Sequence, residues 1–126
     1  MTIANINNSL SKADTDRKTG IKMIQLTGDV YMSVFAIELG KGQNIPAHFH
    51  KNHIETYFIL DGKGLVRTGV ITNDTLHWNE DISVNAGDCF TIFPGEVHEF
   101  TNISDKILRI LGTAPLSHSQ HDRYFI

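Results

Sequence analysis

The sequence has very little cysteine: Cys89 is the single one in 126 residues, so no disulfide can form within the chain. It lacks a cluster of lysine and arginine, and its formal net charge is −3, which disfavours nucleic acid or an anionic membrane surface as a partner. No run approaches the roughly 18 consecutive apolar residues that a membrane-spanning helix needs. The first residues also lack the basic and then apolar order of a signal peptide. We therefore expect a protein of the reducing cytoplasm.

The composition is that of an ordinary globular domain, with 40% apolar and 20% charged residues. A chain of this length can bury a core of its own and is expected to form one domain. Residues 1–20 are polar and rich in asparagine, serine, lysine and aspartate. This segment is therefore predicted to be an N-terminal polar arm that is flexible or lies on the surface.

Short strand-like segments follow one another closely after the arm, and turns rich in glycine, aspartate and asparagine separate most of them. We expect strands over residues 21–26, 30–39, 54–60, 64–71, 75–78, 89–93, 97–101 and 107–113. A helical period is absent except for a weak one within the first 14 residues. Many short strands without alternating helices predict an all-β sandwich or barrel.

The predicted strand over residues 30–39 has apolar side chains on both faces, because both alternate sets of its residues are mostly apolar. A strand of this kind is expected to be covered on both sides. The barrel interior would cover one face, and either the arm or a second subunit would cover the other.

Two histidines and a carboxylate lie close together in the stretch before the third of these strands. His48 and His50 are two residues apart, so on an extended segment their side chains share a face, and Glu55 follows five residues later. Imidazole nitrogens and a carboxylate oxygen are common ligands of a divalent transition metal. His98 lies far downstream and can join them only through the fold.

The spacing of these residues resembles the two motifs of the cupin superfamily, and the resemblance covers residues 42–102. The first motif is matched in order by Gly42, His48, His50, Glu55 and Gly62. The second is matched by Gly87, Asp88, Gly95, His98 and Asn102, with Phe93 at the position of the motif's proline and Pro94 directly after it. Within the superfamily, the sequence is most similar to the small mannose-6-phosphate-isomerase-like members.

The resemblance implies a double-stranded β-helix, which is a small jelly-roll barrel, and a homodimer. It divides the chain into an arm over residues 1–20, a cupin barrel over 21–115 and a C-terminal tail over 116–126. It also implies one divalent metal bound by His48, His50, Glu55 and His98. Imidazole and carboxylate ligands suit iron, manganese, zinc and nickel alike, so these residue types do not select the metal.

Tyr57 and His53 are the candidate catalytic residues. Tyr57 shares a strand face with Glu55, so its phenol can donate a hydrogen bond to a metal-bound oxygen or act as a proton donor. The alternative is a core side chain whose hydroxyl reaches a backbone carbonyl. His53, which is expected in the loop before the strand, is the second candidate for contact with substrate or metal.

The remaining chemically distinctive residues have simpler interpretations. Arg67 and Arg109 lie in strand-like segments and either pair outward with a carboxylate or bind an anionic substrate inside, and periodicity does not decide between the two. Cys89 is predicted to be a small buried side chain. Solvent or an interface is expected around His77, His118 and His121.

These features predict a metal-dependent enzyme that acts on a small oxygenated metabolite, anionic or sugar-like, by dioxygenation or by non-redox isomerisation or lyase chemistry. A non-catalytic module that binds a metal or a sugar is the alternative, since it would show the same motifs. A metal-free sugar-nucleotide isomerase is a third reading, which is disfavoured because all four ligand positions are filled. The sequence does not identify the substrate.

Overall fold

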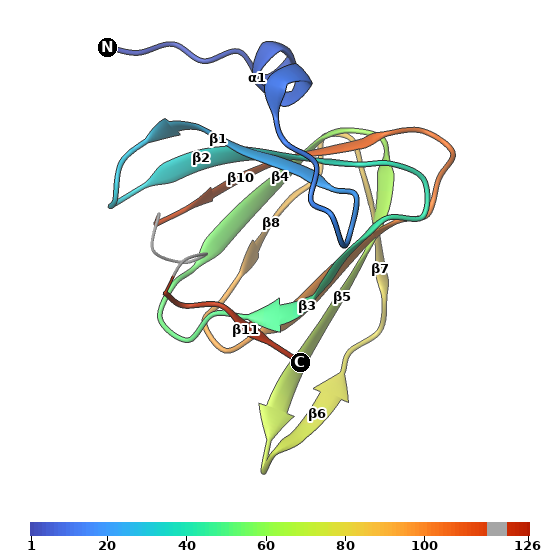
Figure 1. Ribbon diagram of the computed structural model, residues 1–126. Coiled ribbons are helices and arrows are strands. Elements are labelled where there is room, and N and C mark those ends of the chain that lie inside the picture. The colour runs from blue at the N-terminus through green and yellow to red at the C-terminus, as the bar shows by residue number, and fades with distance from the viewer. Residues whose placement is uncertain (116–120) are drawn as a thin grey trace.

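In the computed structural model, which describes residues 1–115 and 121–126, eleven strands form two antiparallel sheets (Figure 1). The elements are α1 (Ile6–Lys12), β1 (Lys22–Gly28), β2 (Ser33–Leu39), β3 (Asn44–Phe49), β4 (Glu55–Asp61), β5 (Lys63–Thr72), β6 (Thr75–Trp78), β7 (Ile82–Asn85), β8 (Cys89–Ile92), β9 (Val97–Asn102), β10 (Leu108–Ala114) and β11 (Tyr124–Phe125). The all-β prediction is confirmed, with one short helix in the arm.

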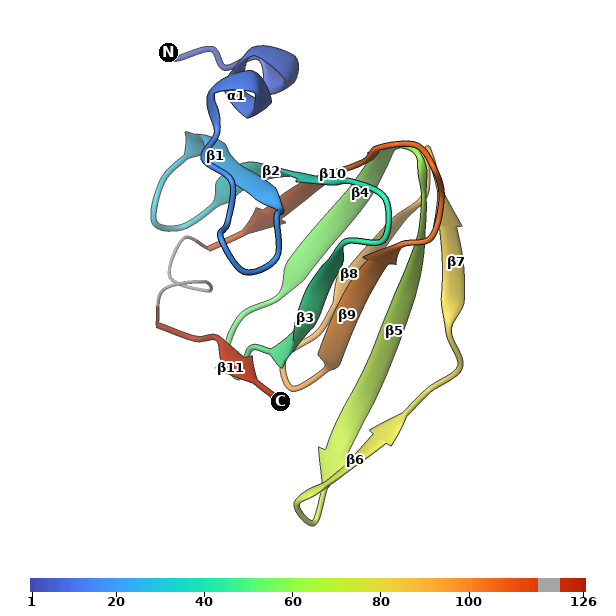
Figure 2. The same cartoon turned by 45° about the vertical axis from the view of Figure 1, so that its right-hand side comes forward.

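The strand order alternates between distant parts of the chain. One sheet has the order β1-β2-β10-β4-β8, and the other has the order β11-β3-β9-β5-β6, with β7 also paired to β5. The two sheets face one another as the walls of a short barrel (Figure 2). This is the double-stranded β-helix expected from the sequence, and it forms a single domain.

Alternation along the strands decides which side chains enter the barrel. In β4, Glu55, Tyr57 and Ile59 are buried, whereas Thr56 and Phe58 between them are exposed, as the period of two requires. Apolar side chains from both sheets join Ile59 in one core, including Phe35, Leu39, Phe100, Leu108 and Ile110. The four predicted metal ligands lie at one end of this core, where β3 ends and β4 and β9 begin.

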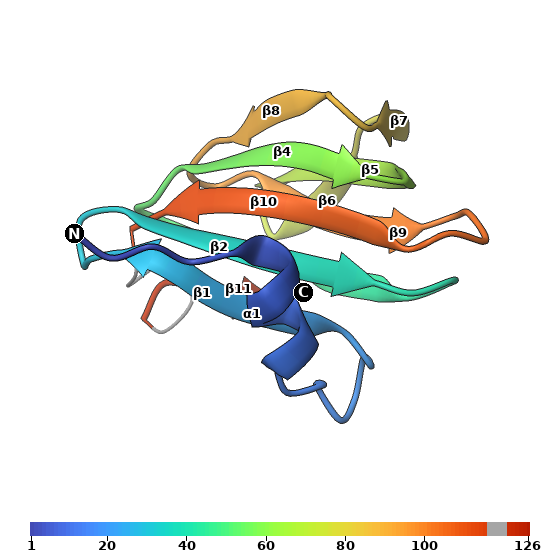
Figure 3. The same cartoon turned by 90° about the horizontal axis from the view of Figure 1, so that it is seen from above.

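The polar arm contains helix α1 and covers part of β2, the strand that was predicted to be apolar on both faces. Asn5 caps the helix, because its side-chain oxygen accepts a hydrogen bond from the Asn8 backbone N–H at 3.0 Å. The helix lies over β1 and β2 and buries Leu10 (Figure 3). Ala36 of β2, whose neighbours in the strand face the core, is also fully buried. The outer face of β2 was predicted to be covered by the arm or by a second subunit, and within the chain the arm covers it.

Several expectations about strands and exposure were wrong. The strand predicted from residue 30 begins only at Ser33, because Asp29 accepts hydrogen bonds from the backbone N–H groups of Tyr31 and Met32 and makes a turn there. Cys89 is exposed instead of buried. It pairs across the sheet with Phe58, whose side chain points out of the barrel, so Cys89 also points outward.

The short strands β3, β7 and β11 were not among the predicted strands. They are two to six residues long, and Pro46 interrupts the apolar pattern of β3. Among the described residues, no helix is long and apolar enough to cross a membrane.

Arg67 and Arg109 both lie outside the barrel interior. The guanidinium of Arg67 stacks 4.0 Å from the centre of the Trp78 ring and faces Asp81 and Glu99. Arg109 pairs with Glu38 at 3.1 Å on the outer surface. Of the two alternatives, both arginines therefore point outward and pair with carboxylates. His77 and His121 are exposed, whereas His118 lies outside the described residues.

Candidate metal centre

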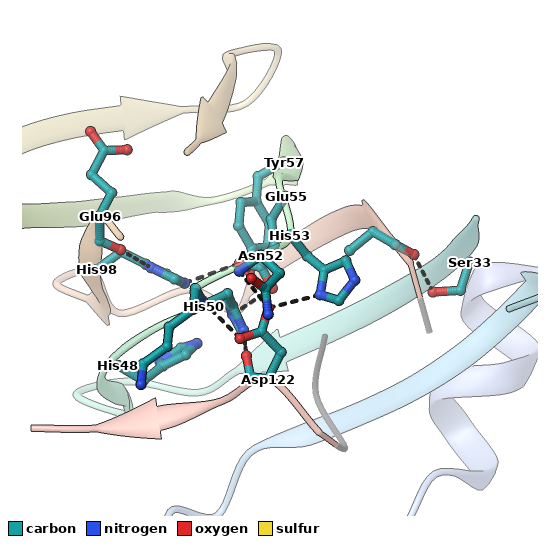
Figure 4. A network of polar contacts seen from close by, with 12 residues as sticks. Ser33, His48, His50, Asn52, His53, Glu55, Tyr57, Glu96, His98 and Asp122 are labelled. Carbon is teal, nitrogen blue, oxygen red and sulfur yellow. Dashed lines mark hydrogen bonds and ion pairs between the residues drawn. The ribbon is translucent and has the colours of Figure 1, made fainter. Parts of the chain in front are cut away.

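The four predicted ligands converge at one end of the barrel (Figure 4). His48 comes from the end of β3, His50 from the loop after it, Glu55 from the start of β4 and His98 from the start of β9. Each offers one ligand atom, and these atoms all lie within 4.8 Å of one another. All four side chains are buried. The fold therefore joins the distant His98 to the three residues that are close in sequence.

A backbone contact between the two motifs draws the loops of the site together. Gly95 precedes β9 and donates its backbone N–H to the carbonyl of His50 at 2.7 Å. Its φ of +85° lies in the left-handed region that glycine adopts without strain. This turn places His98, three residues later, beside His50.

Each of the three histidines is oriented by a hydrogen bond from its Nδ1 atom to a backbone carbonyl. The pairs are His48 with Pro46 at 2.8 Å, His98 with Glu96 at 3.1 Å, and His50 with Asp122. A carbonyl oxygen only accepts hydrogen bonds, so Nδ1 carries the proton in each ring. In the neutral imidazole, Nε2 then holds the lone pair that can bind a metal.

The Glu55 carboxylate lies between two of these rings. Nε2 of His50 is 3.1 Å from Oε1, and Nε2 of His98 is 3.0 Å from Oε2. With the protons on Nδ1, lone pairs face a negative carboxylate at these distances, which is unfavourable unless a cation lies among them. Three neutral nitrogens and one anionic oxygen therefore fit a divalent transition metal.

His48 is neutral at physiological pH. Burial, followed by the nearby His98, lowers the pKa of its imidazole from 6.5 to about 3. A metal can therefore bind this ring at neutral pH without first displacing a proton from it.

Tyr57 holds the carboxylate of Glu55. Its hydroxyl donates a hydrogen bond to Oε2 of Glu55 at 2.6 Å, and the side chain is 3% exposed. Burial, followed by the negative charge of Glu55, raises the pKa of Tyr57 well above its ordinary value, so the phenol remains a donor. The hydroxyl thus bonds a predicted metal ligand instead of the backbone carbonyl considered as the alternative.

Asp122, which sequence reasoning missed, ties the C-terminal segment to the loop between His50 and Glu55. Its carboxylate accepts hydrogen bonds at 2.8 Å from the backbone N–H groups of Lys51 and Asn52 and from Nδ1 of His53. Burial alone would raise the pKa of Asp122, but these hydrogen bonds hold it below its usual range. We call this set of contacts the Asp122 clasp. It holds the three residues that directly follow His50.

His53, the second catalytic candidate, belongs to this clasp. Its side chain is 27% exposed, and its Nδ1 is held by Asp122. His53 is not among the residues that line the cavity beside the ligands. A catalytic role for His53 stays a prediction. In the structure, its contact with Asp122 helps to position the loop that follows His50.

A cavity of about 610 Å³ opens beside the four ligands. Its inner wall includes His48, His50, Glu55 and Tyr57, and apolar side chains such as Phe35 and Ile37 continue that wall. Arg123 and Phe125 of the C-terminal segment form another part of the lining, and the arm contributes Asp14, Thr15, Asp16, Lys18 and Thr19. A volume of this size holds a small organic molecule.

Comparisons with known proteins agree with the geometry. The family model described as Cupin domain matches residues 35–113. An uncharacterised protein with a double-stranded β-helix domain from Klebsiella pneumoniae superposes with a TM-score of 0.71 at 16% identity, over 91% of this chain and 90% of that one. A predicted oxalate decarboxylase from Thermotoga maritima gives 0.69 at 21% identity, over 92% and 99% of the two chains.

A third similar structure is an oxalate oxidase in complex with glycolate, with a TM-score of 0.65 at 22% identity. The alignment covers 85% of this chain but 57% of that one. No curated protein matches the chain. At these identities, the structural likeness shows the fold alone.

Proposed function

Because the chain belongs to the cupin domain family and buries a complete set of four ligands, we propose that it is a metal-dependent enzyme acting on a small oxygenated anion. The observation that carries this proposal is the convergence of these four ligands beside a cavity of about 610 Å³, whose wall includes His48, His50 and Glu55. The residues that would hold the ion are His48, His50, Glu55 and His98. A bound divalent ion would supply a Lewis acid and, if it is iron or manganese, chemistry with dioxygen.

The protein's own side chains have positioning roles around this centre. Tyr57 donates to Glu55, backbone carbonyls hold the three imidazoles, and the Asp122 clasp fixes the loop of His50. The apolar wall with Phe35 and Ile37 limits the access of water to the ligand. The two candidate acid–base groups, Tyr57 and His53, are thus engaged in contacts with Glu55 and Asp122.

This engagement favours dioxygenation as the reaction. Isomerisation or elimination needs a side chain that moves a proton on the substrate, whereas Tyr57 and His53 already bond Glu55 and Asp122. In dioxygenation, the substrate is oxidised and both atoms of dioxygen enter the products, so no further reductant is needed. The similar structures described as an oxalate oxidase with glycolate and a predicted oxalate decarboxylase point to small carboxylates as a substrate class to test first.

The test combines metal analysis with an oxygen-electrode screen of small hydroxy, keto and dicarboxylic acids. Protein purified without added metal should contain about one transition-metal ion per chain, and a chelator should abolish activity. Oxygen uptake in proportion to substrate loss is the expected result. Protein that lacks metal after purification and takes up none on reconstitution would refute the proposal.

Isomerisation or lyase chemistry is a second candidate, favoured by the one observation that Tyr57 both lines the cavity and carries a hydroxyl beside Glu55. It predicts turnover without oxygen, so the same screen in anaerobic solution separates it from dioxygenation. Ligand binding without turnover under either condition would instead support the non-catalytic metal- or sugar-binding module.

Tyr57→Phe separates a positioning role from a catalytic one, because it removes the hydroxyl and keeps nearly all the volume. If Tyr57 acts through Glu55, the affinity for metal should fall about 10-fold, and turnover should return at saturating metal. If the phenol instead donates a proton to substrate, kcat should stay low in fully metal-loaded protein. Competition with a fluorescent chelator measures the affinity. Tyr31→Phe, at a residue that is 83% exposed, is the control and should change neither quantity.

We also propose that the protein forms a homodimer in the cytoplasm. Exposed apolar side chains gather at the turn between β1 and β2, where Val30, Tyr31 and Met32 are all more than half exposed. An interface that covers such residues should exceed about 1,000 Å² in total. Light scattering at micromolar concentration should therefore give twice the chain mass of 14.1 kDa, and a value at the chain mass itself would refute the dimer.

A further inference from the structure

Arg123 brings a positive charge to the cavity that the metal-binding residues face. It lines this cavity together with His48, His50 and Glu55. Its position is set on both sides, since Asp122 before it forms the clasp and Phe125 after it pairs with His48 in the sheet. The side chain is therefore presented by a fixed segment of backbone.

The guanidinium of Arg123 has an unusual environment. Its central carbon lies 4.8 Å from the centre of the Phe125 ring, and that ring lies 6.0 Å from the ring of His48. Its Nε atom is buried and makes no hydrogen bond to any residue in the described part of the chain. Arg67 and Arg109 differ, because each faces carboxylates on the outer surface. Arg123 thus has hydrogen-bonding capacity that the described residues do not use.

The charge of Arg123 also changes the pKa values of two side chains at the site. After the larger effects of burial and of His98, it lowers the pKa of His48 further, and it opposes the rise in the pKa of Tyr57. With a divalent ion bound, the ligand set carries a net charge near +1, because Glu55 is its one anion. The cavity would then present positive charge at the metal and at Arg123, and the part of its lining that the arm forms carries Lys18 together with the carboxylates of Asp14 and Asp16.

We propose that Arg123 binds a second anionic group of the substrate, so that the enzyme prefers small acids with two anionic groups over acids with one. This inference rests on the proposed function and adds the substrate class to it. One end of such a molecule would chelate the metal through a carboxylate and a neighbouring oxygen. The other end would carry a carboxylate or a phosphate, which a guanidinium binds through paired hydrogen bonds.

The experiment uses manganese-loaded protein and calorimetric titration with two matched pairs of probes. Malate is compared with lactate, which lacks the second carboxylate, and 3-phosphoglycerate is compared with glycerate, which lacks the phosphate. In at least one pair, the acid with two anionic groups should bind about 10- to 100-fold more tightly, as expected for hydrogen bonds to a charged group. The pair with the larger ratio identifies the preferred anionic group.

Arg123→Gln should remove this preference while the affinity for the monoanions and the manganese content stay unchanged. Arg67→Gln, which removes an arginine from the outer surface, is the matched control and should keep the preference. Arg123→Lys keeps the charge without the planar pair of donors and should keep part of it. Unchanged manganese content in each variant shows that the site has folded.

Equal affinities within both pairs, or a preference that survives in Arg123→Gln, would overturn the inference while leaving a metal-dependent enzyme in place. Failure of the wild-type protein to bind manganese or any of the four acids would refute the proposed function, and the inference would fall with it. The metal and monoanion titrations therefore report on the proposed function, and the ratios within each pair report on Arg123.

Discussion

Replacing His98 with alanine is expected to lower the metal affinity of the protein by about 100-fold or more, since even residues that merely support metal ligands contribute about 10- to 100-fold. His98 is fully buried, and its Nε2 lies 3.0 Å from Oε2 of Glu55, so no neighbouring water replaces the lost nitrogen easily. The stabilisation that added metal gives to the folded protein should disappear with it, because this gain depends on the ratio of metal concentration to dissociation constant. Metal content after dialysis and the metal-dependent change in Tm measure the two effects.

His77→Ala is the control for this experiment. His77 is exposed on β6, far from the four ligands along the chain and on another strand. Its replacement should leave metal content and the metal-dependent rise in Tm at the wild-type values. Equal losses in the two variants would contradict the assignment of His98 as a ligand.

Replacing Asp122 with alanine should destabilise the metal-free protein by roughly 2–4 kcal/mol, because hydrogen bonds to a buried charged group are worth about 1.5–3 kcal/mol each and water replaces part of them. The change leaves the backbone N–H groups of Lys51 and Asn52 and the ring of His53 without their common acceptor. Urea unfolding of wild type and variant measures the difference.

The same substitution should weaken metal binding about 10-fold, since the loop that carries His50 loses its support. The backbone carbonyl that accepts from His50 is still present in the variant, so the loss should be smaller than for His98→Ala. Asp105→Ala is the matched control, because Asp105 pairs with Lys41 in solvent with 86% of its side chain exposed. It should change stability by less than about 1 kcal/mol. An Asp122 variant that unfolds at the wild-type urea concentration would show that the clasp contributes nothing.

The grouping of most of the candidate metal ligands could be predicted because their signal is local and periodic. Alternation along an extended segment predicts that His48 and His50 share a face, and both are buried although His50 lies just after β3. Glu55 and Tyr57 share a face of the next strand, which the burial of both confirms. The all-β class followed from closely spaced short strands. The resemblance then supplied His98, whose approach to the others depends on the pairing of β3 with β9.

Asp122 and Arg123 could not be predicted in this way. The contacts of Asp122 with the loop of His50 span 71 and 72 residues of sequence, and nothing near Asp122 or Arg123 distinguishes them from charges in a solvated tail. The outward orientation of Cys89 could not be predicted either, because it depends on its pairing with Phe58, whose side chain lies on the outer face of β4. Single side chains whose roles arise from long-range pairing leave no periodic pattern in the sequence.

The ring of Phe35 occupies space that Gly112 leaves by having no side chain. A Cβ atom at Gly112 would lie 2.3 Å from Cζ of Phe35, and Phe35 itself packs edge-on against Tyr57 with ring centres 6.2 Å apart. Gly112 is paired across the sheet with Phe35 on one side and with Tyr57 on the other. Because Phe35 lines the cavity, a larger residue at 112 would require a smaller one at 35. Evolution can therefore reshape the cavity of this barrel by exchanging volume between two strands, while His48, His50, Glu55 and His98 stay in place.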